Sequence, residues 1–140
     1  MSDEITSKGH AFPEPELRRL RDLRLKLLHL HKSLLDMERV NFEKVFGPVN
    51  SGELLQLVIN HAQFAWLRLI SALVVQIDEM LDTDEPAAVN DFQELLGQVR
   101  TLFLSTKNED FQQKYQAALQ REPAIVLAHA EVMKLLRRGA

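Results

Sequence analysis

Cysteine is absent from this 140-residue chain, and glycine, proline and aromatic residues are scarce, with five glycines, five prolines and 6% aromatic residues. Without cysteine the chain can form neither disulfides nor thiolate metal sites. The glycines are scattered, so no glycine-rich phosphate-binding loop exists. The few aromatic residues lie in apolar surroundings and form no stacking platform for single-stranded nucleic acid.

The sequence also lacks any strand-like alternation, any apolar leader and any strong charge of one sign. The polar first residues do not resemble a secretory signal peptide, which predicts a cytoplasmic protein. A net charge of −3 gives no general attraction to nucleic acid or to anionic membranes. Polar residues interrupt the most apolar segment, around residues 64–75, too often for a transmembrane span. We therefore expect no membrane partner.

What the sequence does contain is leucine-rich helical periodicity in a single domain. Residues 1–13 lack periodicity and are expected to form a flexible tail, followed by one helical-bundle domain over residues 14–140. A first helix is predicted from about residue 14 to the stop signal Gly47-Pro48. Asn50 or Ser51 can cap a second helix, with Glu53 in its first turn, that runs to about residue 81.

Three shorter helical segments follow. A start signal at residues 83–86 precedes a helix ending near residue 104. A capping-box pattern from Thr106 to Glu109 precedes the next helix. Pro123 either kinks that helix or separates it from a final one.

The helix lengths constrain the assembly. At ~1.5 Å per residue the first two helices are each nearly 50 Å long and the third is under 30 Å. The expected fold is all-α, an antiparallel four- or five-helix bundle built on a long hairpin of the first two helices. The helix over residues 51–81 is apolar around most of its circumference, which favours a homodimer formed through it. The alternative is a monomer with this helix at its centre.

A basic run near the start of the first helix resembles a nucleic-acid footprint. It comprises Arg18, Arg19, Arg21, Arg24 and Lys26. In an up-down bundle these residues meet acidic residues at the neighbouring helix ends. The acidic residues are Asp78, Glu79, Asp82, Asp84, Glu85, Asp91 and Glu94, with the basic Lys134, Arg137 and Arg138 nearby. Neutralisation within the chain is therefore favoured, and nucleic acid is not an expected partner.

Ionisable residues form an unusual polar line inside the apolar faces of the first two helices. The line comprises Arg24, His31 and Glu38 on the first helix and His61, Arg68 and Glu79 on the second. With the turn centred on residues 47–50, Glu38 is expected near the level of His61 and His31 near the level of Arg68. Buried charges are costly unless paired, so these residues should satisfy one another.

Three interpretations of the polar line remain open. In the first, it is a structural network in which Glu38 accepts from Arg68 and a histidine. In the second, it binds a small anionic group, with Trp66 or Tyr115 packed nearby; this candidate site comprises His31, Glu38, His61 and Arg68. In the third, His31, Glu38 and His61 bind a metal, which is disfavoured because the chain lacks Glu-x-x-His, His-x-x-x-His and His-Glu-x-x-His motifs and because Arg68 would repel a cation.

No nucleophile–base motif accompanies these residues, so no catalytic residue and no cofactor are expected. The segments HKxLLxxER, SGELLQL and FAWLRxxSxLVVxIDE, within residues 30–82, resemble a small set of uncharacterised bacterial proteins. This resemblance covers about two-fifths of the chain and implies a cytosolic helical bundle without an established activity. The ligand spacings of hemerythrin-like, DinB-like and ferritin-like bundles are absent.

The sequence therefore predicts a non-enzymatic interaction or regulatory module that dimerises through the helix over residues 51–81 and has a possible protein partner. The alternative is a small anionic-ligand binder or an enzyme that uses the polar line.

Overall fold

The computed structural model describes residues 14–82 and 89–137, and all regular elements in these ranges are helices, which confirms the all-α prediction. The elements are α2 (Glu14–Phe46), α3 (Ser51–Asn60), the 3-10 helix η1 (Ala62–Leu67), α4 (Arg68–Asp82), α5 (Val89–Leu104), α6 (Glu109–Arg121) and α7 (Pro123–Arg137). The expected tail over residues 1–13 and the start signal at residues 83–86 lie outside the described residues.

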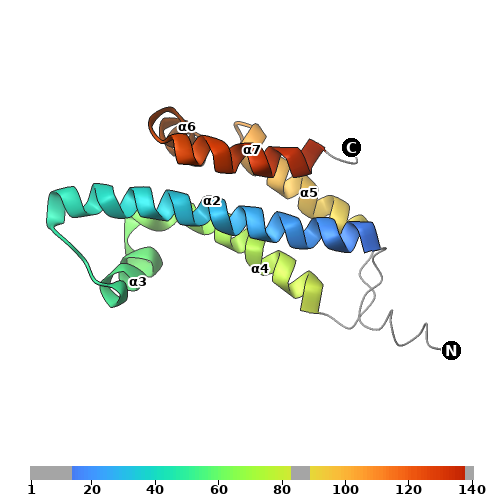
Figure 1. Ribbon diagram of the computed structural model, residues 1–140, viewed down its shortest axis with the longest axis horizontal. Helices are drawn as coiled ribbons and strands as arrows, with labels where there is room; N and C mark the ends of the chain where they lie inside the picture. The colour runs from blue at the N-terminus through green and yellow to red at the C-terminus, as the bar shows by residue number, and fades with distance from the viewer. Residues whose placement is uncertain (1–13, 83–88, 138–140) are drawn as a thin grey trace.

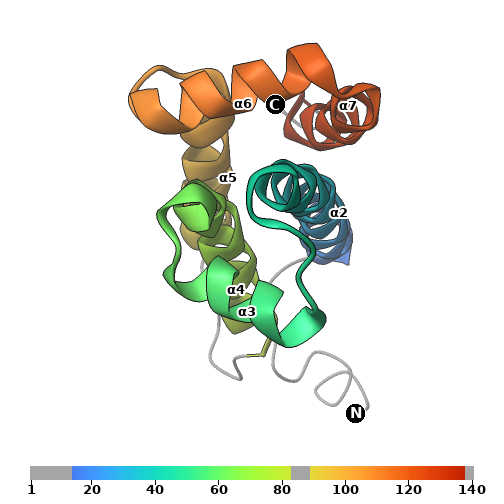
Figure 2. The ribbon, with the colours of Figure 1, turned by 90° about the vertical axis from the view of Figure 1, so that its left-hand side faces the viewer.

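The long helix α2 is the axis of the molecule. Leucines that recur every three or four residues give α2 one apolar face, and five of them are fully buried: Leu20, Leu23, Leu27, Leu30 and Leu34. α4 packs along one side of α2 and α7 along the other (Figure 1). Viewed end-on, α5 lies beside α4, and α6 bridges from α5 to α7 (Figure 2).

The predicted continuous helix over residues 51–81 is wrong, because the chain breaks at His61. α3 ends at Asn60, one 3-10 turn follows, and α4 begins at Arg68. The two halves are bent by 77° relative to each other, which directs α3 away from the remaining helices (Figure 1). The break also changes the register predicted for the hairpin. Glu38 lies opposite Trp66, five residues beyond the predicted level of His61.

The helix ends follow local signals in most places. Gly47 adopts φ 91° where α2 stops, a conformation that residues with a side chain rarely adopt. Of the two predicted caps, Asn50 is the one used, and it forms a capping box with Glu53 in which each side chain accepts from the other's backbone N–H, at 2.8 and 2.9 Å. Pro123 begins a separate helix, α7, after Glu122 ends α6.

The capping box predicted from Thr106 to Glu109 is wrong. α6 begins at Glu109 with Asn108 at the N-cap, and no side chain caps it. The preceding loop is instead folded around Ser105, whose hydroxyl donates to Thr101 O at 2.7 Å and accepts from the Lys107 N–H at 3.2 Å. This arrangement holds Thr106 outside the helix.

The basic run on α2 is partly neutralised within the chain. Arg24 pairs with Asp78 of α4, as predicted, whereas Lys26 pairs with Glu131 of α7 at 3.3 Å. Arg19 donates to the Leu135 carbonyl at 2.6 Å, near the end of α7, and lies over the Phe92 ring. The predicted partners Asp84 and Glu85, and the basic Arg138, lie outside the described residues.

Candidate functional site

Glu38 is the one buried charged side chain in the part of the chain that the structure describes, with 8% of its surface exposed. Its carboxylate accepts from the Trp66 indole N–H at 2.8 Å and from the Gln63 side-chain amide at 2.9 Å. The Gln63 amide also donates to the backbone carbonyl of Glu38 at 3.2 Å. Two donors from η1 therefore hold one carboxylate on the inner face of α2.

His61 occupies the break itself, as the last cap of α3 and the first cap of η1. Its Nδ1 accepts from the backbone N–H of Gln63 at 3.1 Å, which satisfies a donor at the start of η1. The ring lies edge-on to the rings of Phe42 and Phe64, with centroids 5.4 and 6.3 Å away. Acceptance at Nδ1 requires that this nitrogen carries no proton.

Arg68 lies on the solvent side of the break. Its guanidinium donates to the carbonyl oxygens of Ile59 at 2.6 Å and Val58 at 3.3 Å. These carbonyls belong to the last turn of α3 and have no intrahelical partner once the helix stops. A cation at a helix C-terminus also interacts favourably with the helix dipole. Arg68 therefore caps α3 from the first residue of α4.

The structure brings together three of the four predicted site residues, but not in the predicted contacts. Glu38 and His61 are linked through Gln63, and Arg68 holds the same break from outside. The expected Glu38–Arg68 hydrogen bond is replaced by the contacts with Trp66 and Gln63. We call Glu38, His61 and Arg68 the break clamp.

His31, the fourth predicted residue, is half-buried one heptad before Glu38 on α2. Burial lowers the pKa of its imidazole below the ordinary value of 6.5. Within residues 14–82 and 89–137, no hydrogen bond joins His31 to the break clamp.

Gln63 and Trp66 are the residues whose roles the sequence reasoning missed. The break at His61 turns the Gln63 side chain towards Glu38. A signal for Trp66 was present, because a buried indole N–H needs an acceptor and Glu38 was the nearer of the two carboxylates in the predicted polar line.

The side chains of the break clamp are already engaged in hydrogen bonds within the chain, which leaves few of their polar atoms to bind a ligand. Every buried side-chain polar atom among the described residues has a hydrogen-bond partner. The same residues contain no group of three His, Asp or Glu side chains that could hold a metal ion. Both Glu38 oxygens are occupied by neutral donors, and Arg68 is occupied by backbone carbonyls. What this arrangement does physically is fix a sharp bend.

A second buried polar pair joins α6 to α7. The Tyr115 hydroxyl lies 2.7 Å from His129 Nδ1, and Tyr115 is fully buried. Burial raises the pKa of Tyr115 and lowers that of His129, and both shifts favour the neutral form of the group. Phe111 stacks on Tyr115, with ring centroids 5.3 Å apart, so the Tyr115 end of the pair lies in the core, whereas His129 is half-buried.

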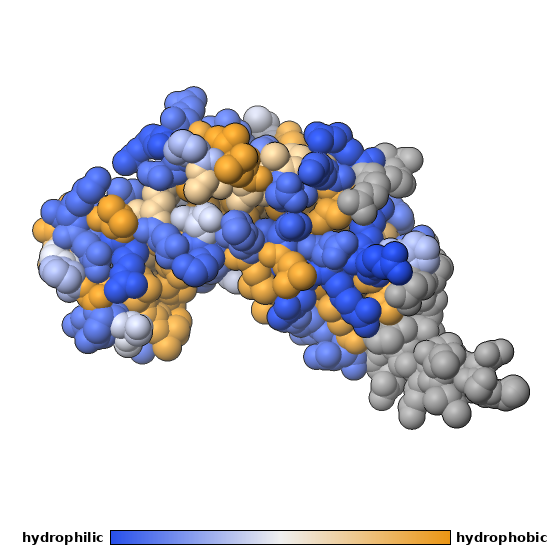
Figure 3. Space-filling model, in the orientation of Figure 1, coloured by the Kyte–Doolittle hydropathy of each residue, from blue (hydrophilic) through white to orange (hydrophobic). Residues whose placement is uncertain are grey.

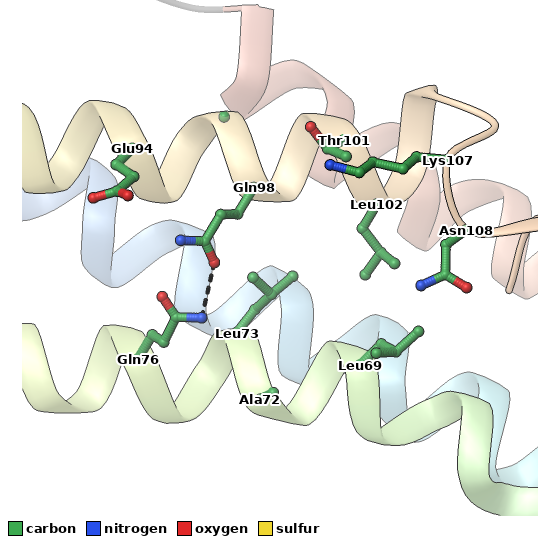
Figure 4. A pocket seen from close by; sticks show the side chains of 11 residues that line it. Leu69, Ala72, Leu73, Gln76, Glu94, Gln98, Thr101, Leu102, Lys107 and Asn108 are labelled. Atoms are coloured by element: carbon green, nitrogen blue, oxygen red, sulfur yellow. Dashed lines mark hydrogen bonds between the residues drawn. The ribbon is translucent and has the colours of Figure 1, made fainter.

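Two surfaces remain open around the broken helix. The first, the α3 ridge, consists of Leu55 and Ile59, one helical turn apart and 57% and 53% exposed. The second, the α4–α5 groove, has a volume of about 790 Å³. Its walls are α4 and the α5–α6 segment, and a hydrogen bond of 2.9 Å from Gln76 to Gln98 crosses it (Figure 4).

No protein-family model, curated protein or solved structure matches this chain. Among the described residues, no single helix is long and apolar enough to cross a membrane; α3 and the η1–α4 segment reach that composition only when the two bent halves are taken together.

Proposed function

We propose that this chain is a non-enzymatic interaction module that self-associates through the two halves of its broken helix, α3 and α4. In this proposal the helices form an antiparallel bundle around the α2–α4 hairpin, and α3 is the part presented to a partner. The single observation that carries the proposal is that α3 has no fully buried residue, although half of its ten residues are apolar.

α3 is held in place by the partly buried Leu54, Leu57 and Val58, which pack against the core, while Leu55 and Ile59 stay exposed. The capping box fixes its first turn, and Arg68 fixes its last carbonyls. The loop before it is also tied to α2: Arg39 donates to the Val49 carbonyl at 2.7 Å, and Glu43 accepts from the Val49 N–H at 2.9 Å. A helix ordered in advance loses less entropy on binding.

The end of α2 exposes two further apolar residues next to those of α3. Val45 and Phe46, just before the turn into α3, are 73% and 67% exposed. In the space-filling view the α3 end of the molecule stands apart, with hydrophobic residues on its surface and a hollow beside it (Figure 3). Single exposed apolar residues are ordinary, but their concentration at one projecting end favours an interface.

Binding of a small anion at His31, Glu38, His61 and Arg68 is the competing function, and no contact of these residues favours it. An anion would have to displace backbone carbonyls from Arg68 and would face the Glu38 carboxylate across the break. Protein association is therefore the function that we carry forward.

Sedimentation equilibrium over nanomolar to micromolar concentrations tests the proposal. We expect a concentration-dependent transition from a 16.1 kDa species to one of twice that mass. The variant Leu55→Gln should shift the transition to higher concentration. Leu127→Gln is the matched control, because Leu127 is a 70% exposed leucine on α7. A 16.1 kDa species at every concentration would refute self-association.

A further inference from the structure

Two exposed apolar surfaces, a helix ridge and a groove, lie on the same chain. The α3 ridge is convex and apolar, and the α4–α5 groove is concave with an apolar floor. The floor residues are Leu69, Ala72, Leu73 and Leu102. Polar residues line its rim: Gln76, Glu94, Gln98, Thr101, Lys107 and Asn108. A ridge of one helix that packs into a groove between two others is the ordinary way in which helices associate.

We propose that the α3 ridge of one copy of this chain packs into the α4–α5 groove of a second copy, and that the second copy returns the same contact. The proposal rests on the self-association proposed above and names the two surfaces that meet. Each copy has one ridge and one groove, so two such contacts close a two-fold dimer and leave neither surface open.

The dimensions fit. The groove runs along α4 from Leu69 to Gln76, which is about 10 Å at ~1.5 Å per residue, and the ridge residues Leu55 and Ile59 are about 6 Å apart on the same scale. Gly97 leaves the α5 wall open, since a Cβ atom built there would meet nothing within 4 Å. Leucine and isoleucine side chains can therefore enter between α4 and α5.

The polar groups around the two surfaces also fit. Gln56 and Asn60 flank the ridge, and the groove rim offers the amides of Gln98 and Asn108 as hydrogen-bond partners. The α3 segment carries one charge, Glu53, and the groove carries Lys107 and Glu94 at its two ends, so Glu53 would meet the Lys107 end (Figure 4). In Figure 4 the Lys107 side chain extends along the groove near Thr101 and Leu102, where an incoming helix would meet it.

The chain cannot fill its own groove with its own ridge. Arg68 holds α3 at 77° to the following helix, and α3 runs from α4 towards the α2 side, whereas α5 lies on the other side of α4 (Figure 2). The ridge and groove can therefore meet only between copies.

The test uses one variant for each surface, analysed separately and as a mixture. Leu55→Gln with Ile59→Gln removes the ridge, and both residues are exposed, so the fold should persist. Gly97→Leu fills the groove and replaces a mid-helix glycine by a better helix former. Gly97→Ala is the matched control, because it gives a similar helix preference with only one methyl group in the groove.

We expect the ridge variant and Gly97→Leu each to weaken the dimer dissociation constant by at least roughly 100-fold, because each change alters both ridge–groove contacts of the two-fold dimer. Gly97→Ala should remain near the unaltered chain. A mixture of the ridge variant and Gly97→Leu should dimerise more tightly than either variant alone. In the mixed dimer the intact ridge of the Gly97→Leu copy meets the intact groove of the ridge variant, so one of the two contacts forms.

Each other outcome overturns the inference in a recognisable way. A dimer that is weakened by the ridge variant and unaffected by Gly97→Leu would mean that two α3 helices meet each other. If both variants weaken the dimer and mixing restores nothing, the two surfaces do not meet. Species that keep growing with concentration would exclude the closed two-fold arrangement. A monomeric unaltered chain would instead refute the proposed self-association itself.

Discussion

Replacing Glu38 by leucine should destabilise the protein, although a buried charge is removed. The substitution leaves the Trp66 indole N–H and the Gln63 amide without their acceptor. Trp66 is 3% exposed, so water has little access to its indole. When one partner of a buried hydrogen bond is removed, the partner that remains is still cut off from water, and this lowers the free energy of unfolding. When all partners are replaced together by apolar groups, the free energy of unfolding can stay the same.

The magnitude follows from those two donors. A hydrogen bond to a charged group contributes about 1.5–3 kcal/mol, and a buried donor left unsatisfied costs about 1–3 kcal/mol. The added apolar contacts of leucine return part of this loss, since a buried aliphatic side chain contributes about 1.5–3 kcal/mol. We expect a net loss of about 2–4 kcal/mol in the free energy of unfolding, which lowers Tm by roughly 6–12 °C in a chain of this size.

Urea denaturation measures this loss. Trp66 is the single tryptophan of the chain, so its fluorescence reports on the same contact while circular dichroism reports on the helices. Asp36→Leu is the matched control, because Asp36 lies on α2 and makes one exposed ion pair with Lys32; it should change stability by less than about 1 kcal/mol. If Glu38→Leu is as stable as this control, the clamp does not stabilise the break.

Three further predictions concern the same elements. Arg68→Met uncaps α3 and should speed amide hydrogen exchange in the last turn of α3, by about tenfold for ~1.4 kcal/mol, without affecting exchange in α7. Gly47→Ala should cost about 1–2 kcal/mol in urea denaturation because φ is 91°, whereas Gly97→Ala should not destabilise. Burial lowers the pKa of His31 and His129 below 6.5, so the unfolded chain binds more protons than the folded chain in this range. The free energy of unfolding should therefore decrease as the pH is lowered from 7 to about 5.5. Replacing both histidines by glutamine should flatten this slope, whereas His29→Gln, at an exposed position, should not.

The helix boundaries that depend on neighbouring residues were predictable from sequence. Gly47-Pro48 stops α2, and Asn50 with Glu53 starts α3. The apolar stripe of α2 likewise predicted its buried leucines, because helical periodicity alone places them on one face. The same capping-box pattern at Thr106 predicted a helix start that does not form. There the Ser105 hydroxyl bonds to the backbone of Thr101 and Lys107, and α6 begins only at Glu109.

The break at His61 depends on residues far away in the chain, so no local pattern marks it. Residues 53–82 contain neither glycine nor proline. A donor pair from η1 reaches Glu38, which is 25 and 28 residues away from its two partners. The polar line was visible in the sequence, but its role as a clamp for a bend follows only from the folded contacts.

Without the two caps at the break, His61 and Arg68, the helix should straighten. His61→Leu with Arg68→Leu removes the two caps at the break and replaces both by a good helix former. Because the chain has no cysteine, cysteines at the exposed positions Gln56 and Glu79 can be spin-labelled selectively. At ~1.5 Å per residue, a continuous helix separates these positions by about 35 Å.

In the broken helix the same two positions are closer. The 77° bend at His61 shortens their separation to about 30 Å at the same rise per residue. Double electron–electron resonance should therefore report a distance about 5 Å longer in the double variant than in the labelled parent. A matched pair of labels at Arg21 and Asp36, exposed positions within α2, should be unchanged. A separation that stays near about 30 Å in the double variant would show that residues 61–67 bend without the caps, and that the preference for a continuous helix inferred from the sequence is itself mistaken.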